Sequence, residues 1–334
     1  MSNAVQTQSH PHHQRPALRL VKTNTLSRDE WLEVRKHGIG SSDAAAAVGL
    51  NPYKSQLELW MEKTGRDADL PKPDPHDTTA PVYWGTLLEP IVAASYTQQT
   101  GRRVRKVNAV LQHPDKPWML ANIDREVIGA GEVQILECKT AGEFGARLWK
   151  DGVPEYIQLQ VQHQLAVTGK QAADVAVLLC GQQLQVHRIQ RDEALITKLI
   201  ALQERFWQYV TSDTPPPVDG SDSAATALQY LYPRDTGEQL DFSQDSQMSA
   251  LFTDLEEARF QADKYKQLEE QFKQQIQQAM GEASKATFET GSVSWKRSKD
   301  STLLDTKRLL TDQPELLEQY SLTRSGSRRF LVSA

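Results

Sequence analysis

Apolar and polar positions follow two different periods along this chain, and these periods predict which segments are helices and which are strands. Apolar residues that recur every three or four positions indicate amphipathic helices. Serine caps or an early proline indicate where several helices begin, and Gly101 indicates where one ends. The predicted helices lie within residues 27–48 (in two pieces), 85–100, 154–168, 192–210 and 247–282.

Short apolar or alternating runs predict the strands. Residues 123–128 and 133–140 flank Gly129-Ala130-Gly131, and this turn predicts a β-hairpin. The second of these strands is mostly apolar, so we expect it to be central in its sheet. Further strands are predicted over residues 103–111, 175–179 and 186–189, and over 287–298 and 328–333 in a small α+β tail.

Changes in composition divide the chain into three parts. Residues 1–24 are polar, and we expect a disordered N-terminal tail. Residues 25–214 carry most of the predicted elements and are expected to form one domain, with a polar loop over residues 66–80. Three prolines at 215–217 mark a boundary, so residues 215–334 are expected to form a C-terminal extension with the long helix.

The long helix carries a seven-residue pattern. Apolar residues recur every seven positions from Leu251 to Ala279, and a second set from Leu255 to Ile276 is broken by Glu269. Such a repeat is typical of coiled coils. About four heptads with one flaw fit two interpretations: a helix that packs on its own domain, and a helix that pairs between subunits.

Composition narrows the class of protein. Of 334 residues 39% are hydrophobic, and no apolar run approaches the ~20 residues that span a bilayer. The two cysteines, Cys138 and Cys180, exclude a disulfide framework and a four-cysteine metal site within the chain, and we expect a cytoplasmic protein. The net charge of −5 does not indicate nucleic-acid binding, yet it allows one basic groove on an acidic surface.

The predicted hairpin carries the strongest chemical signal. Glu137 and Lys139 lie two residues apart on one strand, so both side chains point to the same face. With the turn centred between Ala130 and Gly131, Asp124 lies directly opposite Glu137, with Cβ atoms about 4.5–5.5 Å apart. Two carboxylates this close repel unless a cation neutralises them, and Mg²⁺ suits ligands that offer only oxygen. Lys139 would then lie beside a metal-bound water.

Each signal also has a purely structural interpretation when taken alone. E-x-K triplets are common on exposed strands, and Glu89 can be an acid that favours a helix N-terminus. Ser41 and Ser42 can be helix caps, or they can offer free amides to an anion that Arg35 grips with two hydrogen bonds. Glutamines at 158, 160, 162 and 164 are typical of a solvated helix face.

Five motifs occur together in this chain, and in this order they resemble the phage lambda exonuclease family in its YqaJ-like branch. Together they are far more specific than E-x-K alone, and the resemblance covers roughly residues 27–334. The motifs are Trp31 to Arg35 with Gly38 to Asp43, Trp84 to Glu89, Asp124, Glu137 to Lys139, and Tyr156 to Gln162.

The resemblance implies a PD-(D/E)xK nuclease fold of the α/β (α+β) class, with a mixed central sheet flanked by helices. It implies degradation of the 5′ strand of linear double-stranded DNA to mononucleotides, which leaves a 3′ single-stranded tail. It also implies Mg²⁺ (or Mn²⁺ as a substitute), with two ions per site, and a ring-shaped homotrimer. The implied partner is a single-strand annealing protein of the Bet or RecT type, in a bacterial cell that carries the phage or prophage.

The resemblance also assigns residues by position. Glu89, Asp124 and Glu137 match the acidic metal site, with the carbonyl of Cys138 as a backbone ligand, and Lys139 matches the catalytic lysine.

A second set of residues matches the family's pocket for the 5′-terminal phosphate. These are Arg35, Ser42 and Gln160. The chain departs from the family at Asn122-Ile123, where the lambda enzyme has a serine and the motif's proline. Asn122 can still donate a hydrogen bond within that pocket.

Two other functions stay open at this point. One is an endonuclease on the same fold, because fold and metal site do not determine which DNA is cut. The other is a phage DNA-binding or assembly adaptor that is not an enzyme and uses the long helix to bind a partner.

Overall fold

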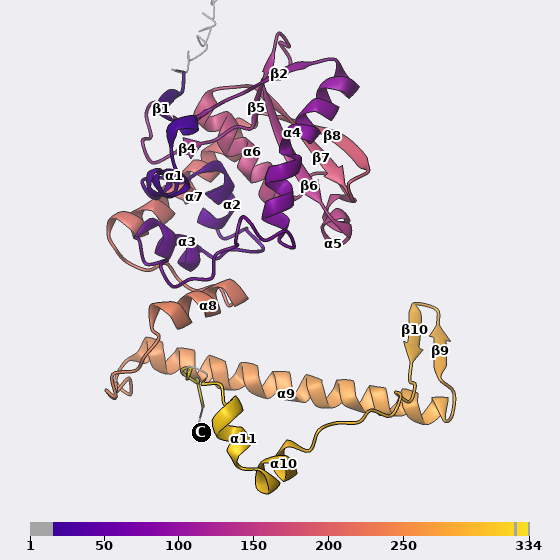
Figure 1. The fold of residues 1–334 in the computed structure, drawn as a ribbon. Helices are drawn as coiled ribbons and strands as arrows, with labels where there is room; N and C mark the ends of the chain where they lie inside the picture. The colour runs from indigo at the N-terminus through magenta and orange to yellow at the C-terminus, as the bar shows by residue number, and fades with distance from the viewer. Residues whose placement is uncertain (1–15, 324–325, 333–334) are drawn as a thin grey trace, which may run out of the picture. The chain divides into compact units, whose positions relative to one another are not determined.

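The computed structural model describes residues 16–323 and 326–332, and the chain forms two units that divide after Pro233 (Figure 1). Residues 1–15 of the expected tail lie outside the described residues. Within the described ranges no helix is long and apolar enough to cross a membrane.

A five-stranded mixed sheet forms the centre of the first unit, in the order β2-β5-β6-β7-β8. β6 (Ile135–Ala141) and β7 (Ala172–Leu179) run parallel, and the other neighbouring pairs are antiparallel. Parallel strands need a crossover connection, and α6 (Glu155–Thr168) lies within it. The remaining strands are β2 (Arg103–Lys106), β5 (Arg125–Ile128) and β8 (Gln183–Gln190).

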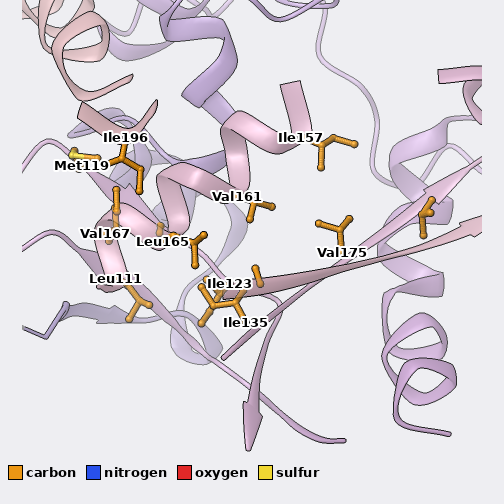
Figure 2. Packing of buried hydrophobic residues seen from close by; sticks show 14 of the residues in the cluster. Leu111, Met119, Ile123, Ile135, Ile157, Val161, Leu165, Val167, Val175 and Ile196 are labelled. Carbon is orange, nitrogen blue, oxygen red and sulfur yellow. The ribbon is translucent and has the colours of Figure 1, made fainter. Parts of the chain in front are cut away.

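Helices cover both faces of this sheet. On one face α6 buries Ile157 and Val161 in a cluster with strand residues such as Val175 (Figure 2). On the other face α4 (Pro81–Thr100) buries Tyr96 against the sheet. A mixed central sheet between helices is the predicted architecture, so the fold class is confirmed.

The side chains of β6 alternate between these two faces. Ile135 belongs to the cluster under α6, whereas Leu136 and Cys138 belong to the cluster under α4. Because successive residues of a strand point to opposite faces, Glu137 and Lys139 share the face that α6 covers.

A smaller three-stranded sheet corrects two expectations. Residues 18–22 pair antiparallel with β3, so the disordered tail expected over 1–24 does not extend through them. The strand predicted over 103–111 is two strands in two sheets, since β2 pairs with β5 whereas buried Ala109–Gln112 pairs with β1 and β4. The sheet contains β1 (Leu18–Lys22), β3 (Ala109–Gln112) and β4 (Leu120–Ala121).

The N-terminal helices begin largely as predicted. α1 (Arg28–Lys36) starts after Ser27, which forms a capping box with Glu30. The predicted alanine-rich helix is shorter than expected: η2 (Ser41–Asp43) is a 3₁₀ turn, and α2 is only Ala44–Ala47. The other short elements are η1 (Thr23–Thr25), α5 (Glu143–Ala146) and η3 (Arg147–Trp149).

A second core lies among the helices of the first unit. α3 (Gln56–Lys63) and α7 (Glu193–Thr211) bury Trp60 and Phe206 in one cluster. α8 (Asp222–Leu231) adds Ala227 to the same cluster, so the first unit continues past the prolines at 215–217.

The second unit is built on α9 (Ser246–Met280), a helix of 35 residues. The strand predicted over 287–298 is a hairpin that ends earlier, formed by β9 (Lys285–Phe288) and β10 (Gly291–Ser294). Residues 328–332 form no strand, contrary to the prediction, and residue 333 lies outside the described residues. Two short helices follow the hairpin: α10 (Thr306–Asp312) and α11 (Glu315–Tyr320).

Candidate metal and phosphate site

The hairpin β5–β6 brings two carboxylates together. Arg125 pairs with Leu136, and continuing this register by one residue places Asp124 opposite Glu137, as the turn predicts. The Asp124 Oδ2 atom accepts a hydrogen bond from the amide of Cys138 at 2.8 Å. The Asp124 carboxylate is therefore held against the strand that carries Glu137.

Both oxygens of Glu137 are held by neighbouring side chains. The Oε1 atom accepts hydrogen bonds from Lys139 Nζ at 2.8 Å and Gln160 Nε2 at 2.6 Å. The Oε2 atom accepts one from Gln164 Nε2 at 2.7 Å. Lys139 Nζ also donates to Gln160 Oε1 at 3.1 Å. Gln160 therefore bridges the acid and the lysine.

Burial and neighbouring charges together set the pKa values of the residues in this site. Burial and the neighbouring charge of Glu137 raise the pKa of Asp124 to about 8. Burial alone would lower the pKa of Lys139, but the negative charges of Glu137 and Asp124 outweigh it and raise that pKa. Burial also raises the pKa of the Cys138 thiol, so this side chain stays protonated and offers no thiolate.

Glu89 lies beside the pair rather than in direct contact with it. Glu89 lies on α4, and its Oε1 atom accepts a hydrogen bond from Arg125 Nη1 at 2.5 Å. The same nitrogen of Arg125 donates to the backbone oxygen of Asp124 at 2.7 Å. The charge of Glu89 still adds, after burial and Glu137, to the raised pKa of Asp124. Joining a shared cation would require Glu89 to leave Arg125.

The donor set fits a hard divalent cation. Asp124 and Glu137 offer carboxylate oxygens, and Mg²⁺ prefers oxygen ligands. In the part of the chain that the structure describes, no three His, Cys, Asp or Glu side chains are grouped to hold a metal ion. The fit therefore rests on the two opposed carboxylates.

Arg35 and Ser42 lie together, as the phosphate-pocket prediction requires. Arg35 Nη2 donates to Ser42 Oγ at 2.8 Å and to Asp43 Oδ1 at 2.7 Å. The guanidinium stacks 4.7 Å from the ring centre of Trp31. A cavity of about 390 Å³ opens beside Arg35, and Lys54 is among its lining residues.

Asp43 and Lys63 organise this group, and sequence reasoning missed both roles. The buried Asp43 Oδ2 atom accepts from Lys63 Nζ at 2.7 Å and from the amide of Gly40 at 3.2 Å. Burial would raise the pKa of Asp43, but the charges of Arg35 and Lys63 hold it well below its usual range. Asp43 closes the glycine-serine motif, whereas Lys63 lies on α3 and carries no sequence signal.

Asn122 links the two groups through its backbone. Its carbonyl accepts hydrogen bonds from Ser41 Oγ at 3.2 Å and Gln164 Nε2 at 3.1 Å. Its side-chain amide donates to the carbonyl of Ala109 at 3.4 Å, within the small sheet. Gln160 thus lies with the carboxylates and Arg35 with Ser42, and the Ser41–Asn122–Gln164 chain connects the two.

Comparisons with known proteins agree with the motifs. Residues 30–171 match the YqaJ-like viral recombinase domain. Protein YqaJ of Bacillus subtilis (strain 168) is 39% identical over 217 residues, which are 64% of this chain and 66% of that protein. The match thus spans slightly less than two thirds of the Bacillus protein.

Solved structures also resemble part of the chain. The crystal structure of an alkaline exonuclease from Laribacter hongkongensis is 24% identical with a TM-score of 0.45, over 55% of this chain and 93% of that one. A phage-related exonuclease from Haemophilus somnus 129PT is 12% identical with a TM-score of 0.36, over 55% of this chain and 99% of that one.

The sheet and the site together define an α+β domain. Its central strand β6 carries Glu137 and Lys139, and Asp124 lies opposite Glu137 across the hairpin. Residues 30–171, the part of the chain that matches the YqaJ-like viral recombinase domain, contain both groups of site residues.

Proposed function

We propose that this chain is a Mg²⁺-dependent exonuclease that degrades linear double-stranded DNA from the 5′ end. The products would be mononucleotides and a 3′ single-stranded tail for annealing-type recombination. One observation carries the proposal: Asp124 lies opposite Glu137, whose carboxylate is bonded to Lys139 on a buried central strand. The match of residues 30–171 to a viral recombinase domain supports the role in recombination.

The proposed metal ligands are Asp124, Glu137 and the carbonyl of Cys138, with Glu89 joining from α4. The bound ions, two Mg²⁺ or Mn²⁺ in their place, would supply activation of a water and stabilisation of the leaving oxygen. Before binding, the raised pKa of Asp124 keeps part of the population protonated near neutral pH. Deprotonated Asp124 is the form that would serve as a ligand, so metal loading should release a proton.

Lys139 and Gln160 would act on the attacking water and its surroundings. Lys139 is charged at neutral pH and lies 2.8 Å from Glu137, so it can orient a water on this face of the sheet. Gln160 holds the lysine and the acid in one arrangement through its amide. A fixed arrangement of this kind lowers the entropy cost of an in-line attack.

Arg35, Ser42, Gln160 and Asn122 are the proposed contacts of the 5′-terminal phosphate. Asp43 fixes the guanidinium of Arg35 from one side, which leaves its remaining N–H groups to grip a phosphate. A terminal phosphate carries more charge than an internal one. The expected result is faster digestion of 5′-phosphorylated ends than of 5′-hydroxyl ends.

The proposed assembly is a homotrimeric ring that works with a single-strand annealing protein of the Bet or RecT type. A ring retains DNA by topology, which suits a chain with a net charge of −5. Arg102 is paired with Glu132 and Arg105 with Glu126, so these arginines would supply little free positive charge to a channel. Light scattering should give about three times 37.6 kDa, and a mass of 37.6 kDa would contradict the ring.

The deciding experiment uses blunt linear duplex DNA with and without 5′-phosphate, and supercoiled plasmid, each with Mg²⁺ or EDTA. We expect Mg²⁺-dependent release of mononucleotides from linear DNA alone, and none from the Glu137→Gln variant. Nicking of the supercoiled plasmid would favour an endonuclease. DNA binding without any cleavage would favour the adaptor.

A further inference from the structure

Gln164 is the residue of α6 that lies deepest against the carboxylates. It is fully buried, one helical turn after Gln160. Its Nε2 atom donates to Glu137 Oε2 at 2.7 Å and to the carbonyl of Asn122 at 3.1 Å. Within residues 16–323 and 326–332, its Oε1 is the one buried side-chain nitrogen or oxygen without a hydrogen-bond partner.

The orientation of this amide is dictated by its two acceptors. A primary amide has two N–H donors, and both are used, one on Glu137 and one on Asn122. Turning the amide over would place Oε1 against two oxygens that cannot donate. The observed orientation therefore leaves a buried acceptor unsatisfied, which costs stability. An apolar side chain of similar size would avoid that cost, but it would leave the buried Glu137 Oε2 atom without this hydrogen bond, so the amide serves the carboxylate.

We propose that Gln164 is a positioning residue for Glu137, which it holds in one rotation for cation binding. Gln160 and Lys139 restrain Oε1 of this carboxylate, and Gln164 is the restraint on Oε2. Groups that hydrogen-bond to a metal ligand without contacting the metal typically contribute about 10–100-fold in metal affinity or activity. The inference rests on the proposed metal site.

The substitution Gln164→Met tests this role, because methionine has similar length and no amide. Gln162→Met is the matched control. Gln162 is also buried on α6, but its amide bonds to the backbone of Gln190 and Asp192, away from the carboxylates. Thermal unfolding of the full chain without DNA is followed during titration with Mg²⁺ and, separately, with Mn²⁺.

The expected result separates the two glutamines. Gln164→Met should raise the metal concentration for half-maximal stabilisation by about 10–100-fold. It should also lower the metal-free Tm, because the buried Glu137 Oε2 atom loses its hydrogen bond. Gln162→Met should lower the metal-free Tm and leave the metal midpoint unchanged. If Gln164→Met fails to fold, Gln164→Asn serves instead, since its shorter amide cannot span to Glu137 Oε2 from the same backbone position.

Two other outcomes would overturn the inference, and they differ. A wild-type protein that neither metal stabilises, and that cuts no DNA, removes the metal site and with it the role of Gln164. A wild-type protein that responds to metal, with an unchanged midpoint in Gln164→Met, removes only the positioning role.

Discussion

Lys139 owes its position to two partners on different elements. Its Nζ lies 2.8 Å from Glu137 on its own strand and 3.1 Å from Gln160 on α6. Burial would lower the pKa of the lysine, but the charge of Glu137, joined by that of Asp124 once it is deprotonated, raises this pKa. It is therefore a fixed positive charge rather than a general base at neutral pH.

Lys139→Met should retain the fold and metal binding and lose cleavage by roughly 10²–10⁴-fold, the usual contribution of a positioned proton-transfer or orienting group. The measurement is the initial rate on linear duplex DNA, with metal binding followed by thermal shift. Lys170→Met is the control, since Lys170, in the connection between α6 and β7, bonds to Glu126, away from the carboxylates. A near wild-type rate in Lys139→Met would refute the assigned role.

Asp124→Asn should stabilise the metal-free protein and flatten its pH dependence. The native pKa of Asp124 is raised to about 8 from 3.8, so between these values the native state holds a proton that the unfolded state has released. Stability therefore falls as pH rises through this window, and asparagine removes that contribution. The check is Tm in EDTA from pH 5 to pH 8.

The control for this pH experiment is Glu126→Gln on the same hairpin. Arg105 and Lys170 hold the carboxylate of Glu126 and lower its pKa, so its loss should destabilise rather than stabilise. An Asp124→Asn variant whose Tm declines as steeply as that of the wild type would show that Asp124 is not the titrating group.

At the scale of elements, local turn chemistry was the best guide to the site. Gly129 adopts φ +75°, which glycine tolerates and which fixes the hairpin turn, so the opposition of Asp124 and Glu137 could be predicted. Whether a side chain of α6 is buried depends on which face of the helix packs against the sheet. The glutamines at 158, 160, 162 and 164 give no sign of that face in the sequence. Burial of Gln164 therefore could not be predicted, and neither could the pairing of Lys63 with Asp43, 20 residues apart.

The turn η2 depends on one buried carboxylate. Asp43→Ala would leave Arg35 and Lys63 without their shared counter-charge, and removing one partner of a buried ion pair costs about 3–5 kcal/mol. Urea unfolding should show this loss at neutral pH. Because the pKa of Asp43 is lowered in the native state, its contribution is present above the unfolded pKa and disappears as pH falls.

The wild type and Asp43→Ala should therefore converge in stability at acid pH. Glu33→Ala is the matched control, since Glu33 pairs with Lys36 on the exposed side of α1 and its removal should change stability little. Equal losses in the two variants would contradict a special role for Asp43.

At the scale of the whole molecule, α8 completes the first unit. Ser223 Oγ accepts from the amide of Ser55 at 2.8 Å, and Ala227 is buried in the cluster that holds Trp60. A chain truncated after Thr214 loses these contacts, whereas one truncated after Pro233 keeps them.

The shorter truncation should melt roughly 5 °C below the longer one, since about 1 kcal/mol corresponds to roughly 2–4 °C at this size and loss of the α8 contacts should cost about 2 kcal/mol. Differential scanning calorimetry of both chains makes the comparison. Identical melting temperatures would mean that α8 adds nothing to the first unit.

The hydrogen bonds of the carboxylate site join residues that are close along the chain. Those from Asp124 to Cys138 and from Glu137 to Gln160 and Gln164 span 14, 23 and 27 residues, whereas the bond from Ser41 to Asn122 spans 81. Closing a short loop costs less entropy than closing a long one, so the hairpin and its crossover helix can form before the N-terminal segment docks. During folding, the groups proposed for bond cleavage would then assemble ahead of those proposed to recognise the DNA end. A substitution within residues 27–43 can accordingly alter the proposed recognition of the DNA end without disturbing the order in which the strand pairs of the carboxylate site form.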